Sequence, residues 1–133
     1  MMRVLAPRPA CFLHGAPGWL RGYQPGEDAV VVRIQEEYDQ SGGLYFEGSY
    51  SYVRVERLNG EKLLQERLDD RLTARLRLDP GTYRFASFQR PCEGNCGSLD
   101  PPTDECERVI RVERAMDVQI LAGAGVPCRL VPR

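Results

Sequence analysis

A strict alternation of apolar and polar residues runs through Leu72-Thr73-Ala74-Arg75-Leu76-Arg77-Leu78. A period of two is typical of a half-buried β-strand, because successive side chains of a strand point to opposite faces. A competing pattern overlaps it: leucine recurs every four residues from Leu64 to Leu76, as on one face of an amphipathic helix. We favour two strands across residues 61–78, joined by a turn at Asp69-Asp70, and the helix remains the alternative.

Similar strand-like patterns lie on both sides of this stretch. They occupy residues 30–34, 51–56, 83–85, 110–112, 118–120 and 126–131. Apolar residues within each pattern fall two apart, which predicts short strands with one face in a core. Phe88 falls outside the phase of Tyr83 and Phe85, which predicts a β-bulge near Ala86-Ser87.

Turn signals separate these strands. Asn59-Gly60 predicts a two-residue hairpin in which both turn residues have positive φ, and this hairpin places Val55 opposite Leu64. Asp79-Pro80-Gly81 predicts a tight turn with positive φ at the glycine. The segment from Arg114 to Asp117 predicts a further hairpin between the strands at Ile110 and Val118.

Many short strands with frequent turns predict an all-β protein. We expect a single immunoglobulin-like or prealbumin-like β-sandwich of about seven strands over residues 28–133. Residues 1–27 are rich in proline and glycine and show no periodicity, so we expect an irregular N-terminal arm. That arm shows no recognisable signal peptide or lipobox.

Two segments carry a resemblance to known proteins. Leu78-Asp79-Pro80-Gly81-Thr82-Tyr83 resembles the "L-x-P-G-x-Y" turn of carboxypeptidase-regulatory-like, transthyretin-like sandwich domains, in which the leucine and tyrosine are core residues. The segment from Gln89 to Cys106 is similar to a cysteine-bearing loop in small exported domains and lipoproteins of actinobacteria, which also have a final cysteine where Cys128 stands. The resemblance implies a secreted or surface-attached β-sandwich and no catalytic residues.

Four of the five cysteines lie in the last third of the chain, at Cys92, Cys96, Cys106 and Cys128. We expect all four to form two disulfides and Cys11 to be free or disordered. The sequence allows three pairings, of which we weakly favour Cys96–Cys106 with Cys92–Cys128. A four-cysteine zinc site is the alternative, although the last two cysteines are too far apart to form a C-x2-4-C knuckle. A redox pair at Cys92 and Cys96 lacks the usual C-x-x-C spacing.

Composition excludes several function classes. Eighteen basic and nineteen acidic residues give a net charge of −1, which argues against a nucleic-acid-binding module. No apolar run approaches the ~20 residues of a transmembrane segment. The single histidine, His14, lies in the arm, so we expect no enzyme, cofactor or metal. Two acidic groups are interpreted as solvated charge: Glu36, Glu37, Asp39 and Glu47, and Asp100, Asp104 and Glu105.

Tyr50 and Tyr52 are the candidate partner surface, because they alternate with Val53 and Val55 and so point away from the core. Exposed aromatic rings offer rigid contact area to a protein or a carbohydrate. We therefore expect a non-enzymatic, disulfide-stabilised β-sandwich that acts as a binding or structural module outside the cell or in the cell envelope. The alternative is an intracellular interaction domain with a four-cysteine zinc site, and a small hydrolase is a remote third.

Overall fold

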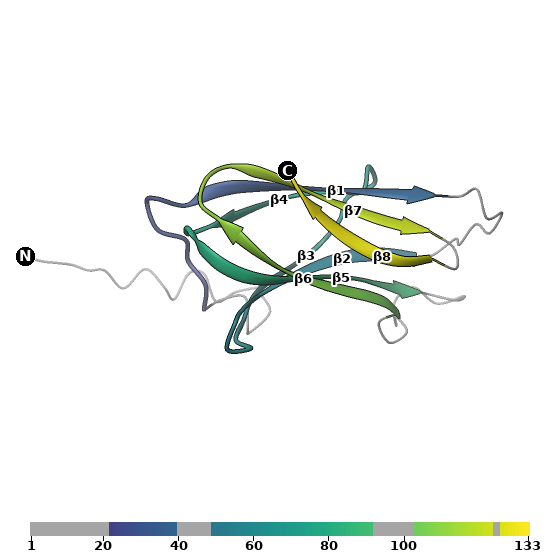
Figure 1. The fold of residues 1–133 in the computed structure, drawn as a ribbon, viewed down its shortest axis with the longest axis horizontal. Helices are drawn as coiled ribbons and strands as arrows, with labels where there is room; N and C mark the ends of the chain where they lie inside the picture. Colours follow the sequence, from purple (N-terminus) through teal and green to yellow (C-terminus); the bar gives the residue numbers. More distant parts are fainter. Residues whose placement is uncertain (1–21, 40–48, 92–102, 124–125) are drawn as a thin grey trace, which may run out of the picture.

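The structure is a computed structural model that describes residues 22–39, 49–91, 103–123 and 126–133. These residues form eight strands and no helix: β1 (Val30–Asp39), β2 (Ser49–Arg57), β3 (Lys62–Arg67), β4 (Thr73–Leu78), β5 (Gly81–Pro91), β6 (Thr103–Val112), β7 (Met116–Gly123) and β8 (Val126–Pro132). They build two four-stranded sheets, in the orders β4-β1-β7-β8 and β3-β2-β5-β6, which lie as two layers in Figure 1. The predicted all-β sandwich is confirmed, with eight strands where about seven were expected.

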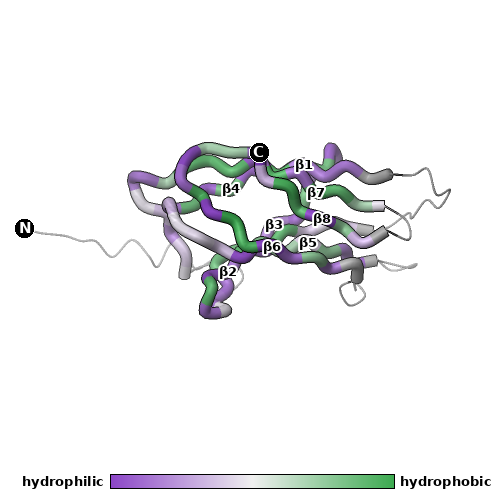
Figure 2. The backbone as a smooth tube through the Cα atoms, viewed as in Figure 1, coloured by the Kyte–Doolittle hydropathy of each residue, from purple (hydrophilic) through white to green (hydrophobic). Residues whose placement is uncertain are grey.

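The core lies between the two layers. Along the strands in Figure 2, hydrophobic and hydrophilic residues alternate, so that each sheet presents one apolar face inward. The largest fully buried side chains come from both sheets: Val32, Ile34, Leu76, Leu78, Val118 and Ile120 from one, and Val53, Val55, Phe85 and Val112 from the other. Burial of these side chains supplies the main driving force for folding.

The disputed stretch over residues 61–78 contains two strands, β3 and β4, and not a helix. In β4, Leu76 and Leu78 are buried, Ala74 packs against the core, and Arg75 and Arg77 are exposed. The predicted inward and outward faces of this strand are therefore correct.

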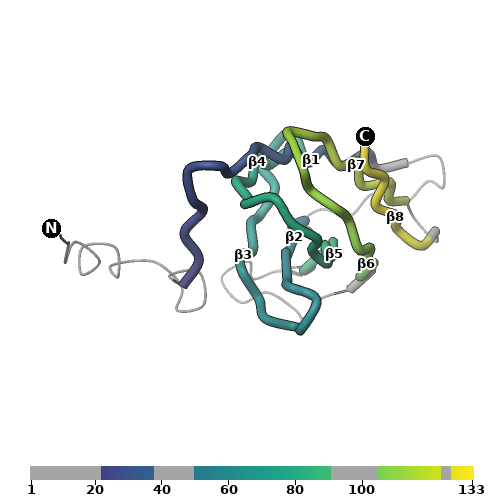
Figure 3. Tube along the Cα trace, turned by 60° about the vertical axis from the view of Figure 1, so that its left-hand side comes forward, coloured from purple at the N-terminus to yellow at the C-terminus, as the bar shows by residue number. Residues whose placement is uncertain are grey.

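The expected joins between strands are wrong at two places. β3 and β4 do not pair through Asp69-Asp70, because they belong to different sheets. The same holds for β6 and β7, whose link crosses from one sheet to the other in Figure 3. β1 lies between β4 and β7, antiparallel to β4 and parallel to β7.

The link from β3 to β4 is held by one carboxylate. Asp69 Oδ1 accepts hydrogen bonds from the backbone N–H groups of Arg71 and Thr73, both at 2.9 Å, and Asp69 Oδ2 accepts one from the Thr73 hydroxyl at 2.7 Å. These bonds hold the pKa of Asp69 below its ordinary value. Leu72 takes φ 62° within this turn, a left-handed conformation that is uncommon for leucine.

The hairpin at Asn59-Gly60 exists, but its turn differs from the predicted one. The Arg57 N–H donates to the Glu61 carbonyl at 2.8 Å. Of the two predicted turn residues, only Gly60 has positive φ, at 95°. These features are typical of a three-residue loop. A register shift between Val55 and Glu56 then restores the predicted pairing of Val55 with Leu64.

The turn at Asp79-Pro80-Gly81 is also present. The reason for glycine at position 81, however, differs from the expected one. Gly81 is not among the residues with positive φ. A Cβ atom at Gly81 would lie 3.3 Å from Tyr83 Oη and 3.4 Å from its Cζ, so any side chain here would push against this ring, which would have to move by a few tenths of an ångström. The Tyr83 hydroxyl donates to the Asp79 carbonyl oxygen at 2.5 Å, the arrangement called a tyrosine corner in sandwich domains.

The segment before β1 is attached to this same turn. The Asp79 N–H donates to the Tyr23 hydroxyl at 3.0 Å, and the Gly26 N–H donates to Asp79 Oδ1 at 2.7 Å. Tyr23 also packs against the hydrophobic core. Part of the sequence that we expected to be an irregular arm therefore contributes to the packing of the sandwich.

Candidate functional site

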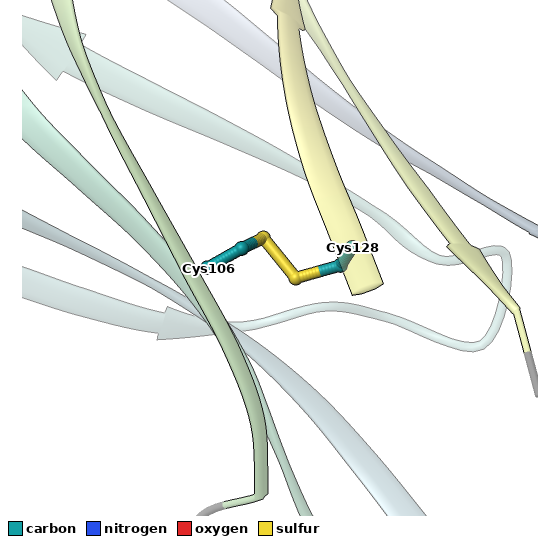
Figure 4. The surroundings of a disulfide bond; sticks show 2 residues. All are labelled: Cys106 and Cys128. Carbon is teal, nitrogen blue, oxygen red and sulfur yellow. A yellow bond between two sulfur atoms is a disulfide. The ribbon is translucent and has the colours of Figure 1, made fainter. Parts of the chain in front are cut away.

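A disulfide joins Cys106 of β6 to Cys128 of β8, with a Cα–Cα distance of 5.7 Å (Figure 4). β6 and β8 are the edge strands of the two sheets on the same side of the sandwich. The Arg108 side chain adds a second link there, because its Nη1 donates to the Leu130 carbonyl oxygen at 3.0 Å. The disulfide therefore fastens one sheet to the other along this edge of the sandwich.

This pairing corrects our preferred one, in which Cys106 bonded to Cys96 and Cys128 to Cys92. Cys11, Cys92 and Cys96 lie outside the described residues. The disulfide disfavours the four-cysteine zinc site, because two of its four ligands would have to be thiolates. Among the described residues, no cluster of three or more His, Cys, Asp or Glu side chains could hold a metal ion.

Tyr50 and Tyr52 lie on the outer face of the β3-β2-β5-β6 sheet, where each ring contacts another side chain. The Tyr52 ring stacks on Phe88 of β5, with 5.4 Å between centroids and 5° between planes. The Arg67 guanidinium lies 4.2 Å from the Tyr50 ring centroid, and that of Arg54 lies 5.3 Å from the Phe88 centroid. Such cation–π contacts fix the orientation of the rings. We call these five residues the aromatic face.

A network of ion pairs borders the aromatic face. The Arg54 Nε lies 2.9 Å from Glu56 Oε2, and its Nη2 lies 3.1 Å from Glu105 Oε2. Glu107 and Arg84 extend the network across β5 and β6 with separations of 3.9 Å or less. The Arg54 side chain is only 13% exposed, so its guanidinium is held in one place. Glu105, expected to be solvated loop charge, is therefore an ion-pair partner on this face.

Sequence reasoning missed Phe88, Arg54 and Arg67 as members of the aromatic face. Phe88 does not mark a break in phase: it lies on the face of β5 away from the core cluster, stacked on its directly opposite partner Tyr52, and is itself only 2% exposed. The predicted irregularity is confirmed only for the pairing of β5 with β6, between Ser87 and Gln89. In the sequence, Tyr83 and Phe85 occupy odd-numbered positions and Phe88 an even-numbered one. That difference was the available signal that Phe88 lies on the other face of β5.

Glu36 is buried, which contradicts the expectation that it is solvated charge. It is 4% exposed, on the inner face of β1 after Val32 and Ile34. Burial raises the pKa of the Glu36 carboxyl, and a hydrogen bond from the Ser51 hydroxyl partly opposes this. Ser51 and Ser87 are also buried, so this part of the core is polar.

Comparison with known proteins adds little. No family model and no curated protein matches the chain. A solved structure described as "Structure of Sugar Binding Protein Pneumolysin" is similar with a TM-score of 0.31 and 14% identity, over 79% of this chain and 23% of that chain. This chain thus spans less than a quarter of that protein, and a likeness at this level carries no inference. Separately, the described residues include no helix long and apolar enough to span a membrane.

Proposed function

We propose that the protein is a non-enzymatic β-sandwich of the cell envelope or exterior that binds a protein partner through the aromatic face. The observation that carries the binding role is the pair of outward-facing tyrosines, Tyr50 and Tyr52, each held by a contact with a neighbouring side chain. Tyrosine and arginine dominate the energetics of protein–protein interfaces. Rigid rings also lose little conformational entropy when a partner binds.

A protein partner fits this face better than a carbohydrate. The Arg67 guanidinium covers the Tyr50 ring and Phe88 covers one side of the Tyr52 ring, so within the aromatic face these two tyrosines do not form an open platform for a sugar. The adjacent ion pairs of Arg54 and Arg84 resemble the polar rim of an interface. Val109 supplies a further apolar contact, because it pairs with Arg84 and is 50% exposed.

Export is supported by the Cys106–Cys128 disulfide, since disulfides persist mainly in oxidising compartments. The test is cell fractionation with alkylation of free thiols before lysis, on cells that carry the native gene with its upstream sequence. We expect the chain in the envelope or medium with Cys106 and Cys128 protected from alkylation. Recovery from the cytoplasm with both thiols alkylated would refute the export part of the proposal.

Photo-crosslinking tests the partner surface without altering its tyrosines. A benzophenone amino acid replaces Val109, which lies on the same outer face, or Arg77, which is exposed on the opposite sheet, as the matched control. We expect a discrete protein adduct from position 109 only, and its loss in a Tyr50→Ser, Tyr52→Ser background that retains the parent melting behaviour. Adducts that persist in that background, or specific retention on a glycan array instead of an adduct, would contradict a protein partner at this face.

A further inference from the structure

The outer face of the other sheet carries an unusual row of charge. Arg75 of β4 lies directly opposite Arg33 of β1, and Arg33 lies opposite Asp117 of β7. Asp117 and Arg133 exchange two backbone hydrogen bonds, of 3.2 and 2.8 Å, which places Arg133 next in line. We call these four residues the arginine row. A hollow of about 460 Å³ lies over it.

The arginine row has more positive than negative side chains. Asp117 is the single carboxylate, and its Oδ1 lies 2.6 Å from Arg33 Nε. Arg133 Nη2 donates to the neutral Gln119 amide oxygen at 2.5 Å, and Arg75 has no acidic partner within the described part of the chain. Like charges directly opposite each other destabilise a sheet, so the Arg33–Arg75 pair carries a cost that a bound anion would remove.

This excess is local to one face of the molecule. On the aromatic side, Arg54 and Arg84 are matched by three carboxylates, those of Glu56, Glu105 and Glu107. The whole chain has a net charge of −1, so general composition does not account for an uncompensated arginine row. A local excess of one sign attracts ligands of the opposite sign.

Neutral hydrogen-bonding side chains complete the lining of the hollow. Thr73, Gln35 and Gln119 lie beside the arginine row. The Gln35 amide is held in place, because its Nε2 donates to the carbonyl oxygens of Glu36 and Arg71 at 3.3 and 3.4 Å. Arg33 remains accessible, with 64% of its side chain exposed. Guanidinium groups present a planar fork of N–H donors that suits oxyanions.

We propose that this hollow binds a doubly charged tetrahedral oxyanion, the phosphate or sulfate ester group of a polar ligand. The three guanidinium groups outnumber the single side-chain carboxylate, so positive charge remains at the hollow for a bound oxyanion to neutralise. The site is independent of the aromatic face, because it lies on the opposite sheet. Its failure would therefore leave the proposed partner surface untouched.

The test is a titration of the ¹⁵N-labelled protein with inorganic phosphate and, separately, with sulfate, at constant ionic strength and with chloride as the control. We expect saturable shifts of the Arg33 and Arg75 Nε–H signals and of the Gln119 side-chain amide. Arg75→Gln should weaken binding at least fivefold. Arg77→Gln, on the same strand and face but outside the hollow, should change affinity less than twofold. Binding of one anion alone would identify which ester the site takes.

Asp117→Asn supplies a second test, in which affinity for the anion is expected to rise and not to fall. It removes the carboxylate that competes with the ligand for Arg33, so affinity for the dianion should rise at least twofold. A site that only needed Asp117 for its structure would lose affinity instead. The proposal is overturned by equal shifts with chloride, by equal losses for Arg75→Gln and Arg77→Gln, or by weaker binding of Asp117→Asn.

Discussion

Cys106 and Cys128 form a disulfide between β6 and β8, the edge strands of the two sheets, so one covalent bond links the sheets along that side of the sandwich. The bond spans a sequence separation of 22 residues, and a loop of this size corresponds to about 3 kcal/mol in the chain-entropy estimate. We expect Cys106→Ser, Cys128→Ser to lose about this much free energy of unfolding in urea titrations.

Reductant provides the matched control for the disulfide. It should lower the stability of the parent to that of the double variant, and leave the variant itself almost unchanged. Peptide mapping without reductant should recover Cys106 linked to Cys128. A peptide that links Cys106 to Cys96 would contradict the pairing.

Gly81 is expected to be intolerant of side chains because of Tyr83 and not because of its own φ. Gly81→Val should destabilise the fold by about 1–3 kcal/mol, the usual cost of overpacking, since the new Cβ would lie 3.3 Å from Tyr83 Oη. Gly22→Val is the control, because no atom lies within 4 Å of a Cβ at that position. The thermal unfolding of both variants is measured in the parent and in Tyr83→Phe, where the Gly81→Val penalty should shrink. An unchanged penalty in Tyr83→Phe would locate the strain elsewhere.

Tyr83 should also control the alkaline limit of stability. Burial raises the pKa of Tyr83 to about 12 from 10.0. The folded state therefore holds the phenol proton more tightly than the unfolded chain, and this contribution is full below pH 10 and is lost as pH rises toward 12. Melting temperatures of the parent should fall more steeply across this window than those of Tyr83→Phe. If the melting temperatures of the parent and of Tyr83→Phe fell equally with pH, the buried Tyr83 phenol would not be the group responsible.

Much of the fold could be predicted because its signals are local. The period-two pattern of β4 depends only on which face of the strand meets the core, and Leu76 and Leu78 are buried as that pattern requires. Whether the next strand pairs in the same sheet or crosses to the other is not a local property. The links at Asp69-Asp70 and after Val112 therefore looked like hairpins but cross between sheets.

The candidate site was predicted only in part for the same reason. Tyr50 and Tyr52 could be placed on an outer face from their own strand, whereas Arg67 and Phe88 reach them from neighbouring strands. The partner of Cys106 likewise depends on which strands form the edges of the two sheets. Register and strand order are set by tertiary packing, which one sequence does not reveal.

Glu36 should make the protein more stable in mild acid than at neutral pH. Burial raises its pKa above 4.5, so the folded state favours the protonated form, and the stability gained by protonation is lost as pH rises through the folded-state pKa. Glu36→Gln keeps a hydrogen-bonding group near Ser51 without the charge. We expect it to raise the free energy of unfolding at pH 7 by about 1 kcal/mol, a typical size for one substitution.

Glu37→Gln is the matched control, because Glu37 is exposed on the same strand. Urea titrations from pH 4 to 8 should show a flatter profile for Glu36→Gln and the parent profile for Glu37→Gln. A Glu36→Gln variant that is less stable at pH 7 would mean that the ionised carboxylate is favoured in the fold.

Ala74 tests whether β4 presents the face that the structure assigns to it. Ala74 lies opposite Ile34, which is 1% exposed, and it packs against the core between Leu72 and Leu76. Ala74→Asp would place a carboxylate against apolar side chains without a partner, which we expect to cost about 2–4 kcal/mol. Arg77→Asp introduces the same side chain on the exposed face of the same strand and should cost less than about 1 kcal/mol. Circular dichroism and thermal unfolding compare the two variants, and equal stability would mean that Ala74 faces solvent, as it would on an amphipathic helix.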